Sequence, residues 1–239
     1  FVYDAAVIVE RIEDLKSFDV IRYAQKACSN IAILDLARRN GVVVDAVSAG
    51  EIHRALRAGY QGGTNAIGIH EIVYTADIFD NDALDLTVDH DIHVNCGSPD
   101  MIDQLGARKS GAEITLRLNP GFGHGHSQKT NTGGQQSKHG IWYEQIEDCK
   151  RRADKHGIKI TGLHMHIGSG TDLEHLAQVC GAMEQAVLEV GNTISTVSAG
   201  GGLPVPYNAG QSYVDLDKYF ALWDESRKKL ETELGNPIK

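Results

Sequence analysis

Short apolar runs alternate along the chain with longer segments in which apolar residues recur at helical spacing. The runs are typical of strands that are covered on both faces, and they lie at residues 20–26, 42–47, 66–75, 92–95, 114–119, 160–167 and 193–198. The helical segments begin at capping residues such as Asp4, Asn30 (or Ser29) and Ser48, and the longest are expected at 144–156, 173–190 and 213–234. Strands that alternate with helices in this order predict parallel βα units.

Two α/β architectures satisfy this order, an open doubly wound sheet and a (β/α)8 barrel. About seven units in 239 residues favour the barrel, whose usual length is about 250 residues. Pro237, Ile238 and Lys239 stand where an eighth strand should begin. We therefore expect one domain over residues 1–239, a TIM-type barrel that stops before its eighth strand, and Phe1 in place of Met likewise indicates a fragment.

Composition excludes classes of function more than it identifies one. Hydrophobic residues make up 41% and charged residues 23%, as in ordinary globular proteins. The net charge of −9 argues against a nucleic-acid partner, which calls for a basic surface. No apolar run approaches the roughly 20 residues that span a bilayer. The four cysteines form no CxxC pair, which favours free thiols in a reducing cytoplasm over a disulfide framework.

Lys26 is the first candidate for chemistry, because it ends a predicted strand just before a helix begins. In α/β barrels this edge carries the catalytic residues. Strict alternation places Ala24 and Lys26 on one face of the strand, and a lysine on an inner face is costly to bury unless it has a use. The structural alternative is a lysine that extends into solvent from the strand end. Residues 22–30 alone do not decide between the two.

Polar residues collect at the carboxyl ends of the predicted strands, and the full set is Lys26, Asp45, Asn95, Arg117, His164, His166 and Gly200–Gly202. His164 and His166 share one strand face, and three interpretations stay open for them. They bind a metal, they are hydrogen-bonded core residues, or one ring stacks on a planar cofactor. Asp45 is the only evident carboxylate at a strand end, so we predict no metal.

Gly200, Gly201 and Gly202 follow the last predicted strand. Backbone without side chains approaches an anion closely, and successive N–H groups form a phosphate-binding nest. A tight turn is the alternative. Ser169, which lies between two glycines, would add a hydroxyl.

The glycine-rich loop at 121–134 lacks the spacing of a dinucleotide fingerprint, and no helix follows it directly. We expect its His124 and His126 in a mobile lid rather than as ligands. A lysine, a phosphate nest and a stacking imidazole on one barrel rim together suggest pyridoxal 5'-phosphate, with Lys26 forming the Schiff base.

The sequence resembles the diaminopimelate decarboxylase family, in the alanine-racemase-like group (fold type III) of pyridoxal-phosphate enzymes. The resemblance is carried, in family order over essentially the whole chain, by RYAQKACSN, VVVDAVSAGE, NPGFGHGHSQKTNTGG with SKHGI, GLHMHIGSG and SAGGGLPVPY. The loop and SKHGI separate it from ornithine and arginine decarboxylases.

The resemblance implies a role for each matching residue. It implies that Lys26 carries the cofactor, that His166 stacks on its pyridine ring, and that Asp45 and Arg117 line it, with Asp45 near the lysine. The phosphate would be held by Ser169, Gly200, Gly201 and Gly202. The implied reaction of this carboxy-lyase is decarboxylation of meso-2,6-diaminopimelate to L-lysine and CO2, the last step of lysine biosynthesis. The implied setting is a cytoplasmic homodimer that acts on a small amino-acid substrate, without nucleic-acid or membrane partners.

Two family features are missing from these 239 residues. One is the EPGR segment, whose Glu pairs with the ring nitrogen and whose Arg binds substrate; the other is the C-terminal β domain, which completes the partner subunit's site. We therefore expect the fragment alone to bind cofactor weakly and to be inactive. The alternatives are a racemase or an ornithine, arginine or carboxynorspermidine decarboxylase on the same fold, and a non-catalytic homologue. A non-catalytic homologue should have lost the lysine or the glycines, and both are present.

Overall fold

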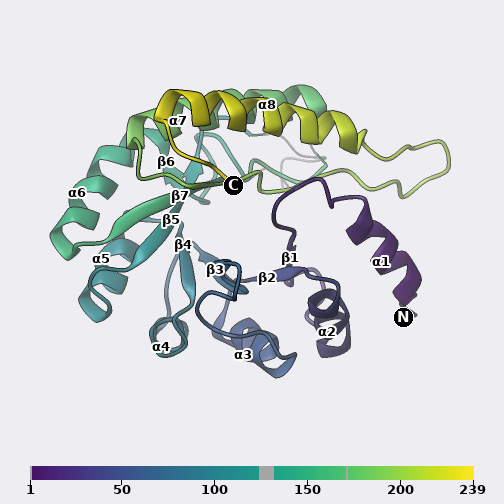
Figure 1. Ribbon diagram of the computed structural model, residues 1–239, viewed down its shortest axis with the longest axis horizontal. Coiled ribbons are helices and arrows are strands. Elements are labelled where there is room, and N and C mark those ends of the chain that lie inside the picture. The colour runs from purple at the N-terminus through teal and green to yellow at the C-terminus, as the bar shows by residue number, and fades with distance from the viewer. Residues whose placement is uncertain (1, 124–131, 171) are drawn as a thin grey trace. The chain divides into compact units, whose positions relative to one another are not determined.

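The computed structural model describes residues 2–123, 132–170 and 172–239. The chain divides into two compact units, residues 1–95 and 96–239. In each unit strands alternate with helices, as the sequence pattern predicts (Figure 1). The boundary between the units falls inside the strand β4, so that Asn95 belongs to the first unit and Cys96 to the second.

The strands of the N-terminal unit are neighbours in the order β1-β2-β3-β4, and the pairs β1-β2 and β2-β3 are parallel. Its elements are α1 (Ala5–Glu13), β1 (Arg22–Ala24), α2 (Ile31–Arg39), β2 (Val43–Ala46), α3 (Ala49–Arg57), β3 (Ile72–Ala76), α4 (Asn81–Asp89) and β4 (His93–Cys96). Figure 1 shows α2, α3 and α4 side by side along these strands. A helix connects each strand to the next because two parallel strands can be joined only by a crossover from the end of one to the start of the other.

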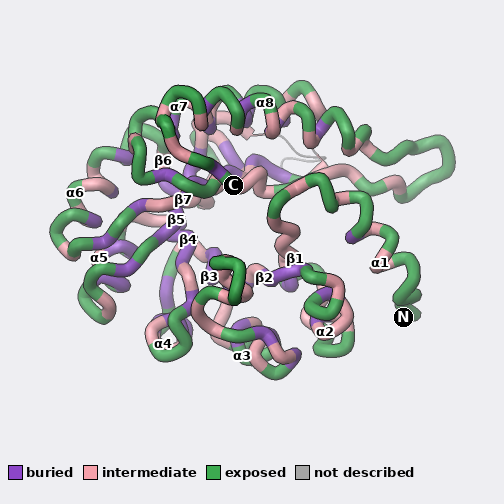
Figure 2. Tube along the Cα trace, in the orientation of Figure 1, coloured by how far each residue is buried: buried purple, intermediate pink, exposed green. Residues whose placement is uncertain are grey.

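The two faces of this sheet differ in polarity. The register places Val44 and Ala46 of β2 on the same face as Ile72 and Tyr74 of β3, and all four are at most 2% exposed. Asp45 lies on the opposite face. Burial of the apolar face drives the packing of the helices, so the polar residues gather on the other face. The buried stretches of the chain lie mainly in the strands and on one side of the helices (Figure 2).

The C-terminal unit contains the parallel strands β5-β7-β8, and β6 pairs with β5. Its elements are α5 (Pro99–Arg108), β5 (Glu113–Asn119), β6 (Ile141–Trp142), the 3-10 helix η1 (Tyr143–Gln145), α6 (Ile146–His156), β7 (Lys159–Met165), α7 (Leu173–Val190), β8 (Thr196–Ser198) and α8 (Leu216–Leu234). Helix α5 packs on α6, and α7 packs on α8.

The free edge of β8 carries one further pair of ladder bonds. The Lys239 N–H donates to the Ser195 carbonyl at 2.9 Å, and the Val197 N–H donates to the Lys239 carbonyl at 2.8 Å. In a parallel pair, the N–H and the carbonyl of one residue bond to two residues of the other strand that are two positions apart, as residues 195 and 197 are here. Ile238 is buried beside it. Strand pairing therefore begins at Lys239, where the sequence pattern predicts an eighth strand.

Local chemistry at the helix ends agrees with the sequence. Asp4, Asn30 and Ser48 each accept a backbone N–H from the first turn of the helix that they precede, as N-caps do. Helices α6 and α8 end at Gly157 and Gly235, both in the left-handed conformation that glycine adopts without cost.

Several details of the predicted elements are wrong. Strand β7 ends at Met165, so His166 does not share its face with His164, and β8 and α8 begin three residues later than predicted. Strand β1 ends at Ala24, two residues before Lys26. Strand β3 begins at Ile72 rather than at residue 66, because Gly68 takes a φ of +75° and the Asn65 side chain accepts the N–H groups of residues 67 and 69 in a turn. Helix α4, which follows an Asp80 cap, is not among the predicted elements.

Candidate functional site

Lys26 lies in a turn that follows β1, not on the strand itself. The Ala27 N–H donates to the Ala24 carbonyl at 3.2 Å, which closes the turn around Gln25 and Lys26, and the lysine is exposed. The strand must end here because the chain has only residues 25–30 in which to reverse into α2. Strand alternation therefore does not fix the direction of Lys26.

Asp45 is joined to the Lys26 turn through the backbone. Its Cα is paired with Ala24, and its carbonyl accepts the N–H of Gln25, the residue before the lysine, at 3.3 Å. This pairing places the main chain of Asp45 beside the residue that precedes Lys26, which is consistent with the prediction that Asp45 lies near the lysine. Ala24 and Asp45 share the polar face of the sheet, which places the Asp45 carboxylate on that face.

Arg22 is a polar residue of this face that the sequence reading did not single out. Its guanidinium donates to the Val44 carbonyl at 3.0 Å and to the His70 carbonyl at 3.1 Å. Desolvation lowers the pKa of Arg22 to about 10, and the charge of Asp45 acts in the opposite direction. A positively charged side chain therefore shares this face of the sheet with Asp45 and interacts with its charge. The available signal was its place two residues before Ala24, on the same strand face.

The polar face of the C-terminal unit contains Arg117, His164 and Ser198 in register on β5, β7 and β8. Nδ1 of His164 lies 2.8 Å from Oγ of Ser198. His164 is therefore a hydrogen-bonded residue of the sheet, which is one of the three interpretations that the sequence left open. Among the residues that the structure describes, no group of three or more His, Cys, Asp or Glu side chains gathers as a metal site would require.

Gly200, Gly201 and Gly202 form a turn with φ of +70°, +71° and +85°. A Cβ on Gly200 would lie 2.0 Å from the Met165 carbonyl oxygen, and one on Gly202 would lie 2.1 Å from the Gly168 carbonyl oxygen. A Cβ on Gly201 would meet nothing within 4 Å. Gly200 and Gly202 therefore pack closely on the main chain at and just after the end of β7, whereas there is free space beside Gly201.

The loop after β7 closes against this turn, because the Gly170 N–H donates to the Gly202 carbonyl at 2.7 Å. Ser169 lies exposed between Gly168 and Gly170. The structure therefore brings together Ser169 and the three glycines, residues about 30 positions apart that the sequence grouped as an anion site. Backbone N–H groups in left-handed turns form concave sites for anions.

His166 follows the last residue of β7 and lies next to the glycine turn. Its Cε1 is 3.2 Å from the position of a Cβ on Gly202, so a side chain at that position would crowd the ring. The predicted site residues thus fall into two groups. Lys26 and Asp45 belong to the N-terminal unit, whereas Arg117, His166, Ser169 and Gly200–Gly202 belong to the C-terminal unit. His124 and His126 lie outside the described residues.

The arrangement is that of an α/β protein with a polar strand face, an exposed lysine after its first strand and an anion-type glycine turn after a late strand. The family described as "Pyridoxal-dependent decarboxylase, pyridoxal binding domain" matches residues 6–237. The chain belongs to this family.

Individual relatives specify the similarity further. The chain is 53% identical over 239 residues to diaminopimelate decarboxylase from Streptomyces coelicolor and 52% identical to that of Escherichia coli K12. Each match covers 100% of this chain and 54% or 56% of the relative, so the chain spans about half the length of these relatives. A crystal structure of diaminopimelate decarboxylase superposes with a TM-score of 0.93, at 52% identity, over 99% of this chain and 56% of the other. The expected fold class, the barrel of fold type III pyridoxal-phosphate enzymes, is confirmed, as is the cofactor class.

Proposed function

We propose that this chain is the cofactor-binding part of a pyridoxal-phosphate-dependent decarboxylase that converts meso-2,6-diaminopimelate to L-lysine and CO2. The observation that carries the proposal is the match to diaminopimelate decarboxylases at 52–53% identity along the whole chain. Lysine and arginine decarboxylases share the fold at 19–21% identity, which concerns the fold alone. The relatives at 52–53% identity therefore support diaminopimelate as the substrate.

The residues of the C-terminal unit fit a phosphorylated planar cofactor. The glycine turn leaves Gly201 open, with no atom where a side chain would stand, and Ser169 is exposed beside it. Successive backbone N–H groups in a turn of this kind can form a site for a phosphate. The ring of His166 lies against Gly202, next to this turn, where it can pack against an aromatic ring attached to the phosphate.

We assign a role to each of these residues from the motifs that resemble the family. Gly200–Gly202 and Ser169 would bind the phosphate, and His166 would support the ring. Lys26, exposed after β1, would attach the cofactor through its amine, with Asp45 and Arg117 lining the site. When bound, pyridoxal phosphate supplies an electron sink for the electron pair that remains on the substrate when the carboxylate leaves as CO2. The protein contributes orientation and a fixed set of charges.

The wider setting is part of the same proposal. Domain organisation is proposed as one cofactor-binding barrel domain over residues 1–239, with a C-terminal β domain elsewhere in the whole protein. We further propose that the whole protein is a cytoplasmic homodimer. Among the described residues, no helix is long and apolar enough to cross a bilayer. That the 239 residues alone bind cofactor weakly and do not turn over stays a prediction.

The visible absorbance of the full-length protein with added pyridoxal phosphate tests the proposal. We expect the visible absorbance band of a lysine-bound cofactor, which Lys26→Ala abolishes. Lys16→Ala removes another exposed lysine and should leave the band intact. L-lysine released from meso-diaminopimelate, without diamine from ornithine or arginine, would identify the substrate. A full-length protein that gives no band would contradict the cofactor assignment.

A further inference from the structure

Asn119 is the last residue of β5 and is 4% exposed. Its Oδ1 accepts the Gly121 N–H at 3.1 Å and the Gly134 N–H at 2.9 Å, and its Nδ2 donates to the Gly134 carbonyl at 3.0 Å. One carboxamide therefore joins two segments, residues 121–123 and 132–134, which we name the loop base. A buried amide that makes three hydrogen bonds is strongly constrained in position.

The two segments of the loop base are in close contact. A Cβ on Gly133 would lie 2.1 Å from the Phe122 carbonyl oxygen. Only glycine permits this approach, because any side chain would collide with the main chain of the facing segment. The loop base is therefore defined by main-chain packing around Asn119.

Thr132 connects the loop base to the end of β7. Its N–H donates to the Ile167 carbonyl at 3.1 Å, and its hydroxyl donates to the His166 carbonyl at 3.0 Å. Both carbonyls lie beyond Met165, the last residue of β7. Thr132 thus supplies donors to two successive peptide groups at the position where the strand has ended.

His166 is consequently contacted on both its main chain and its ring. Thr132 binds its carbonyl, and Gly202 lies against its ring. We propose that Asn119 and Thr132 are positioning residues for His166. They hold it through a path that leads from the end of β5 by hydrogen bonds to Gly134, along the main chain of the loop base to Thr132, and by hydrogen bonds to the end of β7. In this arrangement a ring that contacts His166 is coupled to the loop base. The proposal rests on the proposed function insofar as that ring belongs to pyridoxal phosphate.

Thr132→Val and Thr132→Ser form a matched pair for the test. Valine keeps the shape and the backbone N–H but loses the hydroxyl, whereas serine keeps the hydroxyl. We expect Thr132→Val to shift the ring resonances of His166 in 1H–15N spectra and to weaken pyridoxal phosphate binding by about 3- to 10-fold, in keeping with the loss of one neutral hydrogen bond. Thr132→Ser should restore both quantities toward those of the unmodified protein.

Asn119→Ala tests the other end of the path. Amide hydrogen exchange at Gly121, Gly134 and Thr132 should accelerate by about 10-fold or more, because these amides lose their acceptor or the support of the loop base. Unchanged His166 resonances and unchanged cofactor affinity in Thr132→Val would overturn the proposal. This test does not depend on whether Asn119→Ala folds. A protein that binds no pyridoxal phosphate in any form contradicts the proposed function instead, while the resonances and exchange rates still decide the role of Asn119 and Thr132.

Discussion

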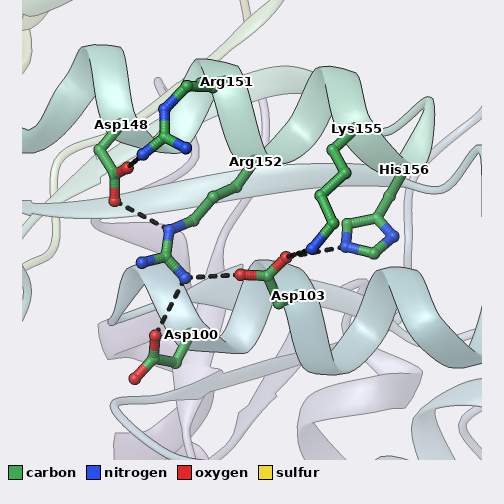
Figure 3. A network of polar contacts seen from close by, with 7 residues as sticks. All are labelled: Asp100, Asp103, Asp148, Arg151, Arg152, Lys155 and His156. Atoms are coloured by element: carbon green, nitrogen blue, oxygen red, sulfur yellow. Dashed lines mark hydrogen bonds and ion pairs between the residues drawn. The ribbon is translucent and has the colours of Figure 1, made fainter.

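The Nε2 atom of His156 lies 2.8 Å from Oδ1 of Asp103, across the contact between α6 and α5. Arg152 and Lys155 also contact Asp103, at 2.5 Å and 3.0 Å, and Figure 3 shows the three side chains converging on this carboxylate. Three cationic or proton-donating side chains from one helix thus meet a single carboxylate on the other. The network ties the two helices together on the surface of the C-terminal unit.

Asp103→Asn should lower the free energy of unfolding at neutral pH by about 1 kcal/mol, since partly exposed ion pairs contribute modestly. Hydrogen bonds from His156, Lys155 and Arg152 hold the pKa of Asp103 well below its ordinary value of 3.8. A depressed folded-state pKa stabilises the protein above the unfolded value, and this contribution is lost as the pH falls below about 4. Urea unfolding at several pH values should therefore show the two proteins converging in acid. Asp100→Asn, which alters a carboxylate that is 83% exposed, is the control and should have little effect.

Gly106→Ala should destabilise the protein by roughly 1–3 kcal/mol through overpacking, although alanine is the better helix former by about 1 kcal/mol. A Cβ at this position would lie 2.3 Å from Cγ of His156. Gly181→Ala, in α7, is the matched change, because nothing lies within 4 Å of its Cβ position, and it should stabilise. Combining Gly106→Ala with His156→Ala should reduce the loss of stability, because the clashing ring is removed. Thermal unfolding of the single and double variants would measure the difference. A Gly106→Ala protein as stable as Gly181→Ala would contradict the packing argument.

Gly200→Ala should cost more stability than Gly201→Ala. Both residues have φ near +70°, so both changes carry the left-handed penalty of about 1–2 kcal/mol. Only Gly200 also meets the Met165 carbonyl, which adds roughly another 1–3 kcal/mol. Urea denaturation of the two variants measures the difference, and equal costs would show that the turn can move away from β7.

Cys28 should react with iodoacetamide well before the other three cysteines in the folded protein. A hydrogen bond from the Asn30 N–H and one with the Tyr3 hydroxyl lower the pKa of its thiol, and thiolate is the reactive form. Cys96, Cys149 and Cys180 are buried, and burial raises the pKa of Cys149 and Cys180 to about 12. Mass spectrometry of timed samples gives the order. Tyr3→Phe should slow the reaction of Cys28, and early labelling of Cys149 would be the contrary result.

The predictable parts of this protein are those that local chemistry decides. Asn30 and Ser48 cap helices because their side chains reach N–H groups two and three residues away. Helix α7 has the bounds that its apolar spacing indicates. The resemblance of five motifs was sufficient for the family, because those motifs lie at the strand ends.

The remaining parts depend on contacts between distant residues. The hydrogen bond between Thr132 and His166 spans 34 positions, and that between His156 and Asp103 spans 53. No periodicity in the sequence encodes such pairs. The turn at Lys26 was missed for a related reason, since the apolar run before it does not reveal where pairing with β2 ends.

The glycine turn after β8 has a consequence for how this site can vary. Gly200 and Gly202 contact carbonyl oxygens of the main chain, which every amino-acid sequence possesses. The spacing between this turn and the end of β7 is therefore independent of the side chains on β7. An alanine scan read out by stability would detect the contact between this turn and the main chain only at the glycines themselves, because there the added carbon, and not the loss of a functional group, causes the damage.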